Sequence, residues 1–268
     1  MTVPALTLPG SICVAPDVED LFEQLGRAVL SSATRAVEER GVFHMALSGG
    51  GTPEPFYVRL MTDPLFRGLP WERTHLWIVD ERRVPFHDEK SNWKMIREAL
   101  ADHVPMKARQ KHPMPVMDQD PAGAYEAELA EVFDLKGGSV PSNSIPRLDF
   151  VLLGMGGDAH TASLFPETEA IDADDRWIVV NAGPKVTPPD RVTMTFPLIN
   201  AAREIAPLLV GAGKAEKLRA IADLLATGET DRRNLPITGI DPERFAPDHL
   251  EGEPGNLTWF LDRAAAGR

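Results

Sequence analysis

The chain has 268 residues, 43% of them hydrophobic and 25% charged, which is ordinary for a soluble globular protein and fits one large α/β domain or two small ones. Its net charge of −12 argues against a broad nucleic-acid-binding surface, and no apolar stretch approaches membrane-spanning length. The one cysteine, Cys13, excludes an internal disulfide, and no basic residue precedes the weakly apolar start. We therefore expect a cytoplasmic protein without a secretory signal.

Near the amino end, apolar side chains recur at helical spacing over residues 21–40, and Gly41 is expected to end this helix. Residues 42–47 predict a strand. After it, Thr52 and Pro53 resemble an N-cap followed by proline at the first position of a second helix.

The same alternation continues along the chain. Further helices are predicted near residues 93–100 and from Lys214 to Leu225, and further strands at 75–79, 148–153, 177–180, 192–196 and 208–210. This order predicts an α/β fold with a mostly parallel sheet covered by helices and with functional loops at the carboxyl ends of the strands. Residues 134–147 are interpreted as a surface loop, and residues 226–256 as irregular.

Two segments that follow predicted strands have the character of ligand loops. LSGGGTP (residues 47–53) places three glycines before a helix start, where backbone N–H groups can meet an anion, although a simple tight turn explains it equally well. In VDERRVPFHDEKSN (residues 79–92), Asp80 stands at a strand end, Arg82 and Arg83 supply cations, and Ser91 can cap the next helix. The remaining charged residues are interpreted as a solvated face: Glu81, Asp88, Glu89 and Lys90.

LLGMGGDAHTASLFP (residues 152–166) combines a buried strand, small residues and an ionisable ring. The small residues leave room for a substrate beside Asp158 and His160, and a histidine can act as a general base on water. The alternatives are a structural histidine and a dinucleotide site, since GMGGDA satisfies G-x-G-x-x-A. Pro166 interrupts the helix that a dinucleotide site needs, so we favour the catalytic interpretation.

Two later segments carry cations that can meet a phosphate. Arg191 begins a strand in DRVTMTFPLIN, and Lys214 follows the glycine turn of VGAGK; each can also be an ordinary surface residue. His44 lies inside a predicted strand and is interpreted as a core residue. No HExxH or Cys/His cluster is present, so no metal site is predicted, and no G-x-S-x-G elbow suggests a serine nucleophile.

In this order the motifs LSGGGTP, VDERRVP with SN, LLGMGGDAHTASLFP, DRVTMTFPLIN and VGAGK resemble the 6-phosphogluconolactonase family, over about residues 20–265. The resemblance implies that residues 1–268 form a single Rossmann-like domain of the glucosamine-6-phosphate deaminase/isomerase type. It also implies hydrolysis of 6-phospho-D-glucono-1,5-lactone to 6-phospho-D-gluconate, the second step of the oxidative pentose phosphate pathway. No metal or organic cofactor and no nucleic-acid or membrane partner is expected, and the chain should be a monomer or weak homodimer.

The resemblance also assigns roles to residues. His160 would activate water, and Asp158 would orient it or shape the pocket. The phosphate would be held by Ser48, Gly49, Gly50, Arg191 and Lys214. Arg82 would face the phosphate or the sugar hydroxyls, which Asp80 and Asn92 would also contact. Ala159 departs from the glycine usual in the family; if this position needs a positive φ, alanine costs on the order of 1–2 kcal/mol.

Three other functions compete with this prediction. An amino-sugar phosphate deaminase of the same fold would resemble this chain, but its glutamate five residues after the histidine is replaced here by Phe165. A sugar-phosphate sensor would carry a DNA-binding domain, for which the roughly 20 residues before the first helix leave no room. The third alternative, an NAD-dependent oxidoreductase, is supported by the glycine pattern alone.

Overall fold

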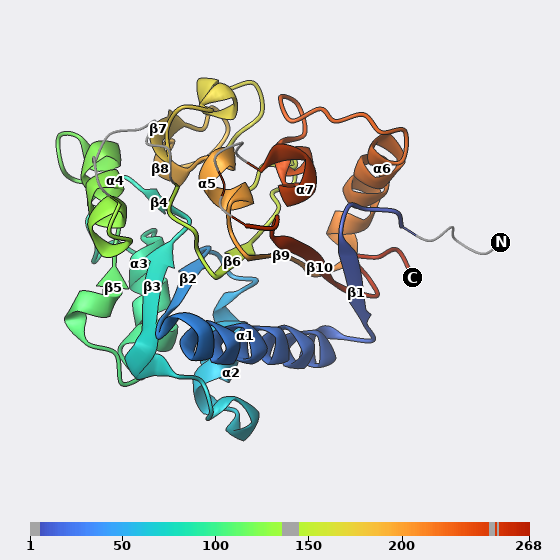
Figure 1. Ribbon diagram of the computed structural model, residues 1–268. Coiled ribbons are helices and arrows are strands. Elements are labelled where there is room, and N and C mark those ends of the chain that lie inside the picture. Colours follow the sequence, from blue (N-terminus) through green and yellow to red (C-terminus); the bar gives the residue numbers. More distant parts are fainter. Residues whose placement is uncertain (1–5, 136–144, 247–249, 251) are drawn as a thin grey trace.

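The computed structural model describes residues 6–135, 145–246, 250 and 252–268. Seven strands form a sheet in the order β1-β10-β9-β6-β2-β3-β5, and every neighbouring pair is parallel (Figure 1). Their bounds are β1 Ser11–Ala15, β2 Phe43–Leu47, β3 Thr74–Ile78, β5 Lys111–His112, β6 Phe150–Leu153, β9 Glu204–Leu209 and β10 Asn256–Asp262. The predicted mostly parallel α/β sheet is confirmed.

A second sheet of three antiparallel strands lies beside the first, in the order β4-β8-β7. Its bounds are β4 Asp80–Arg82, β7 Ile178–Ala182 and β8 Asp190–Met194. The antiparallel register places Arg82 opposite Arg191. The predicted strand at 192–196 ends early, because Phe196 and Pro197 begin a short helix after the extended Thr195.

Helices flank the larger sheet. They are α1 Val18–Arg40, α2 Glu54–Thr62, α3 Asn92–Ile96 with a π-helical continuation Arg97–Ala101, α4 Pro121–Val132, α5 Phe196–Asn200, α6 Ala215–Leu225 and α7 Pro242–Phe245. α1 packs against β1, β2 and β10. Figure 1 shows α1 and α2 below the larger sheet and α5 and α7 above it. No helix of the described ranges is long and apolar enough to cross a membrane.

Helix α1 shows how local sequence sets the element ends. Asp17 accepts a hydrogen bond from the N–H of Asp20 at the start, and Gly41 adopts the left-handed conformation, with φ 77°, at the end. The cap expected at Thr52 is wrong: α2 begins only at Glu54, and the position before it is Pro53, which makes no side-chain cap. Thr52 and Pro53 still belong to the glycine turn, and Thr52 lines the pocket described below.

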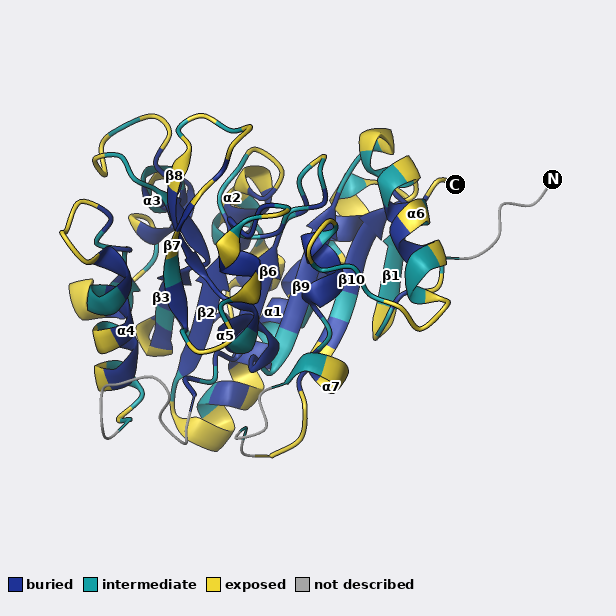
Figure 2. Cartoon of the chain, turned by 90° about the horizontal axis from the view of Figure 1, so that it is seen from above, coloured by how far each residue is buried: buried dark blue, intermediate teal, exposed yellow. Residues whose placement is uncertain are grey.

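The core lies between the helices and the larger sheet. Every residue of β2 and β6 is buried, as expected for parallel strands covered on both faces, and Figure 2 shows these strands in dark blue. The largest fully buried side chains include Trp77, Trp259, Tyr57 and Tyr125.

Three histidines also lie in or beside this core. His44 is 7% exposed, which confirms the core interpretation, and its Nδ1 accepts a hydrogen bond of 3.1 Å from Trp77 Nε1. His75 Nδ1 lies 2.9 Å from His112 Nε2. Burial, and then the positive charges of His75, His112 and Arg40, lower the pKa of His44 to about 3. Burial, and then the positive charges of His112 and Arg109, lower the pKa of His75 to about 4.

Candidate active site

The loops after β2, β3, β6 and β9 surround a cavity of about 470 Å³ at the carboxyl edge of the larger sheet. This is the edge at which parallel sheets bind ligands. Nine of the ten predicted site residues line the cavity: Ser48, Gly49, Gly50, Asp80, Arg82, Asn92, His160, Arg191 and Lys214. The tenth, Asp158, lies beside His160 without lining the cavity.

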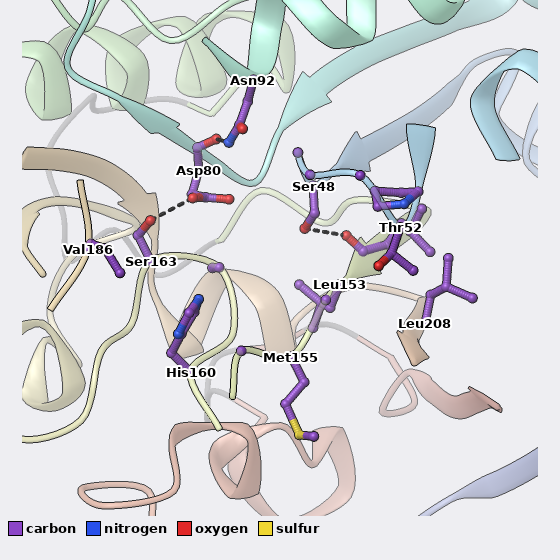
Figure 3. Close-up of a pocket in the computed structure, with 18 of the residues that line it drawn as sticks. Ser48, Thr52, Asp80, Asn92, Leu153, Met155, His160, Ser163, Val186 and Leu208 are labelled. Carbon is purple, nitrogen blue, oxygen red and sulfur yellow. Dashed lines mark hydrogen bonds between the residues drawn. The ribbon is translucent and has the colours of Figure 1, made fainter. Parts of the chain in front are cut away.

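The histidine and the aspartate form a pair. Nδ1 of His160 lies 2.5 Å from Oδ1 of Asp158, and the same oxygen accepts a hydrogen bond of 3.2 Å from the His160 backbone N–H. Burial alone raises the pKa of Asp158, but the charge and hydrogen bonds of His160 outweigh it, so that the pKa of this carboxyl lies below its ordinary value. Figure 3 shows the His160 ring pointing from its loop toward the side on which Ser163 and Asp80 lie.

The turn that carries this pair needs its small residues. A Cβ on Gly156 would lie 2.2 Å from both Cε1 and Nδ1 of His160 and 2.8 Å from Oδ1 of Asp158. Ala159 is fully buried and has a φ of 68°. Because φ is positive, the backbone strain expected from the sequence for an alanine at this position is present: L-residues are disfavoured in this left-handed region.

The glycine turn after β2 is fixed from both sides. Ser48 Oγ donates a hydrogen bond of 2.8 Å to the carbonyl of Leu152 on β6, and Tyr57 donates one of 2.6 Å to the carbonyl of Ser48. Gly50 has a φ of 111°, which only glycine adopts readily. The turn leads into α2, whose amino end favours an anion.

The segment after β3 forms the opposite wall. Asp80 Oδ2 accepts a hydrogen bond of 2.6 Å from Ser163 Oγ, and the Asp80 carbonyl accepts one of 2.8 Å from Asn92 Nδ2 (Figure 3). Ser91 caps α3 as predicted, accepting from the backbone N–H of Lys94.

Two expectations for charged residues of this segment are wrong. Glu81 is fully buried rather than solvated. Arg83 does not supply a cation to the cavity, because its guanidinium donates to the carbonyls of Val116 and Asp118 instead.

Three cationic residues of the described ranges line the cavity: Arg82, Arg191 and Lys214. Arg191 is 5% exposed, and its Nη1 has no hydrogen-bond partner within the described part of the chain. Burial, followed by the nearby charge of Arg82, holds the pKa of Arg191 below its ordinary value. Lys214, after β9, donates a hydrogen bond of 2.7 Å to the carbonyl of Met155.

Ser163 and Phe165 are among the cavity residues that sequence reasoning missed, although both lie in the HTASLFP motif. Ser163 binds Asp80, and the ring of Phe165 lies 4.8 Å from that of His160 and 6.0 Å from the Arg191 guanidinium. The residue types alone give no signal of these contacts. Over the described residues, no three His, Cys, Asp or Glu side chains are grouped as a metal ion would require.

Fold and site together define an α/β protein with a cavity lined by cationic side chains and a histidine–carboxylate pair at the carboxyl edge of a parallel sheet. The family model described as "Glucosamine-6-phosphate isomerases/6-phosphogluconolactonase" matches residues 16–250. The chain belongs to this family.

Several relatives are similar over nearly the whole chain. A 6-phosphogluconolactonase of Synechocystis sp. is 39% identical over 91% of this chain and 92% of its own length. The human GDH/6PGL endoplasmic bifunctional protein is 36% identical over 91% of this chain, which spans only 28% of that protein. The structure of 6-phosphogluconolactonase from Trypanosoma cruzi matches with a TM-score of 0.78 and 25% identity, covering 99% of both chains.

Proposed function

We propose that this protein hydrolyses 6-phospho-D-glucono-1,5-lactone to 6-phospho-D-gluconate, the second step of the oxidative pentose phosphate pathway. The observation that carries the proposal is that His160, paired with Asp158 behind it, lines the same cavity as the buried, incompletely hydrogen-bonded Arg191. A general base beside an anion site suits a substrate with a reactive carbonyl at one end and a phosphate at the other. The relatives named 6-phosphogluconolactonase support the same substrate.

His160 is the general base in this proposal. Because Nδ1 faces the carboxylate of Asp158, the proton of the neutral ring resides on Nδ1 and the lone pair of Nε2 is free for water. Nε2 takes a proton from water as the hydroxide attacks the lactone carbonyl. The tetrahedral intermediate then expels the ring oxygen, which takes the proton back from His160. Asp158 stabilises the imidazolium between the two transfers.

The phosphate is anchored by Arg191, Lys214 and the turn at Ser48, Gly49 and Gly50. The neighbouring guanidinium groups of Arg82 and Arg191 repel one another, so a dianion between or beside them is favoured. Asp80 and Asn92 contact sugar hydroxyls. Anchoring the remote phosphate holds the carbonyl near the base, which is how binding energy away from the reacting bond supports catalysis.

The remaining features of the proposal concern the whole chain. Residues 1–268 form one domain, which the pairing of β1 with β10 supports because these strands come from opposite ends of the chain. The enzyme works in the cytoplasm without metal or organic cofactor, as a monomer or weak homodimer.

The proposal is tested by offering the wild-type protein two phosphosugars. Freshly generated 6-phosphogluconolactone should be hydrolysed well above its spontaneous rate, and glucosamine 6-phosphate should release no ammonia. Phe165 contacts His160 at the position where a deaminase would carry an acid, and its ring cannot transfer a proton. Ammonia release without lactone hydrolysis would replace the proposal with the deaminase function.

A further inference from the structure

Glu81 is a buried carboxylate between two residues that line the cavity, Asp80 and Arg82. Its own side chain takes no part in the cavity and instead binds the amino end of α3. One oxygen accepts from the backbone N–H groups of Arg82 and Asn92, each at 2.7 Å. The other accepts from Trp93 N–H at 2.7 Å and from Ser91 Oγ at 3.0 Å. This carboxylate therefore ties β4 to α3 across the loop between them.

The four hydrogen bonds are what make a buried charge tolerable here. Burial raises the pKa of Glu81, and the donors from Trp93, Asn92, Arg82 and Ser91 oppose that rise. An amide in the same place can accept these bonds on only one of its two heavy atoms, so at least one of the donors would be left facing another donor.

The residue that Glu81 holds connects two walls of the pocket. Asn92 Nδ2 donates to the Asp80 carbonyl, and its amide lies so close to Gly49 that a Cβ there would be 1.8 Å from Oδ1. Asn92 thus packs between the segment after β3 and the glycine turn after β2. Any shift of its backbone changes the distance between these two segments.

We propose that Glu81 is a positioning residue for substrate binding. It does not touch the substrate. It fixes Asn92, and through Asn92 it fixes the spacing between Asp80 and the turn at Gly49 that the phosphosugar must span. This inference depends on the proposed lactonase function, because the spacing matters only for a ligand bound between these walls.

Glu126 offers a matched control. It is also buried, at 8% exposure, and it accepts hydrogen bonds from the backbone N–H groups of Trp177 and Ile178 and from the Arg176 guanidinium. It does not line the cavity. Glu81→Gln and Glu126→Gln therefore disturb similar buried networks, only one of which adjoins the pocket.

The experiment measures KM and kcat for the lactone, the Kd for 6-phosphogluconate and thermal stability in wild type and both variants. Glu81→Gln should raise KM and Kd about tenfold, the effect of roughly one misplaced hydrogen bond, with kcat changed less than about threefold. Glu126→Gln should lower stability comparably and leave KM unchanged. An unchanged KM in Glu81→Gln, or an equal rise in both variants, would overturn the inference.

A double mutant separates this route from a general loosening of the pocket. If Glu81 acts through Asn92, then Glu81→Gln added to Asn92→Ala raises KM no further than Asn92→Ala alone. Fully additive effects would contradict this route. Ser91→Ala removes one of the four donors and serves if Glu81→Gln does not fold: a KM raised about two- to threefold supports the inference, and an unchanged KM overturns it.

Failure of the wider proposal is recognisable in the same experiment. A wild-type protein that does not hydrolyse the lactone would refute the proposed function. Wild-type hydrolysis with unaltered KM in Glu81→Gln would refute only the role of Glu81.

Discussion

Gly156→Ala should disable the catalytic pair while leaving the fold intact. The added Cβ would lie 2.2 Å from Nδ1 and Cε1 of His160, whereas ordinary contacts begin at 3.4 Å. The ring must therefore retreat by the difference, 3.4 − 2.2 Å, or about 1.2 Å. Because Nδ1 is held to Asp158 at 2.5 Å, this retreat breaks or bends the hydrogen bond that orients the base.

A misplacement of about 1 Å at a catalytic group lowers turnover on the order of 100-fold. We expect that loss in kcat for 6-phosphogluconolactone, measured with a coupled dehydrogenase and corrected for spontaneous hydrolysis. Binding of 6-phosphogluconate should persist, because the proposed phosphate ligands lie on other segments, Arg191 on β8 and Lys214 in the turn before α6.

Gly157→Ala is the matched control in the same turn. A Cβ on Gly157 meets nothing within 4 Å, and its φ is not positive, so turnover should stay near that of the wild type. The reasoning would be refuted if Gly156→Ala, still folded, kept kcat within about threefold of wild type, well short of the loss expected from misplacement. A similar loss in both variants would refute it as well.

Two further predictions concern stability. The pKa of His44, about 3 when folded, returns to about 6.5 when the chain unfolds; the unfolded state therefore binds the extra proton, and stability falls as pH falls below 6.5. His44 alone should make the free energy of unfolding about 2 kcal/mol smaller at pH 5 than at pH 7.5; equal values by urea denaturation would contradict this. Ala159→Gly relieves about 1–2 kcal/mol of strain at φ 68° but loses a buried methyl and makes the unfolded chain more flexible. Because these effects oppose one another, the free energy of unfolding of the variant should stay within about 1 kcal/mol of wild type. A change above about 2 kcal/mol would show that the relief of strain and the two losses do not cancel.

The central strands and the pocket loops were predictable because their signals are local. An apolar run followed by glycines, as at 42–51 and 150–157, indicates a buried strand that ends in a ligand turn. Of the ten site residues proposed from the family motifs, nine line the same cavity.

Elements that depend on distant partners escaped sequence reasoning. β1 is a short edge strand, and it pairs with β10 at the other end of the chain, a contact that no local pattern reveals. Helix α4 was not predicted either; it is apolar but only weakly amphipathic.

Glu81 shows the same limit for a single side chain. In the charged sequence DERR, Glu81 looks like a solvated residue. It is nevertheless buried, and it accepts hydrogen bonds from donors at the amino end of α3, ten or more residues later in the chain. Ala159 is the reverse case, since the motif identified the position at risk and only the backbone shows that its φ is positive.

The claim that His160 activates water is tested most directly by comparing wild type with His160→Ala. The measurement is hydrolysis of freshly generated 6-phosphogluconolactone, coupled to 6-phosphogluconate dehydrogenase and corrected for the spontaneous rate. We predict rapid wild-type turnover that falls about 10²- to 10⁴-fold in the variant, which still folds and still binds 6-phosphogluconate. Equal rates in the two proteins would contradict the account.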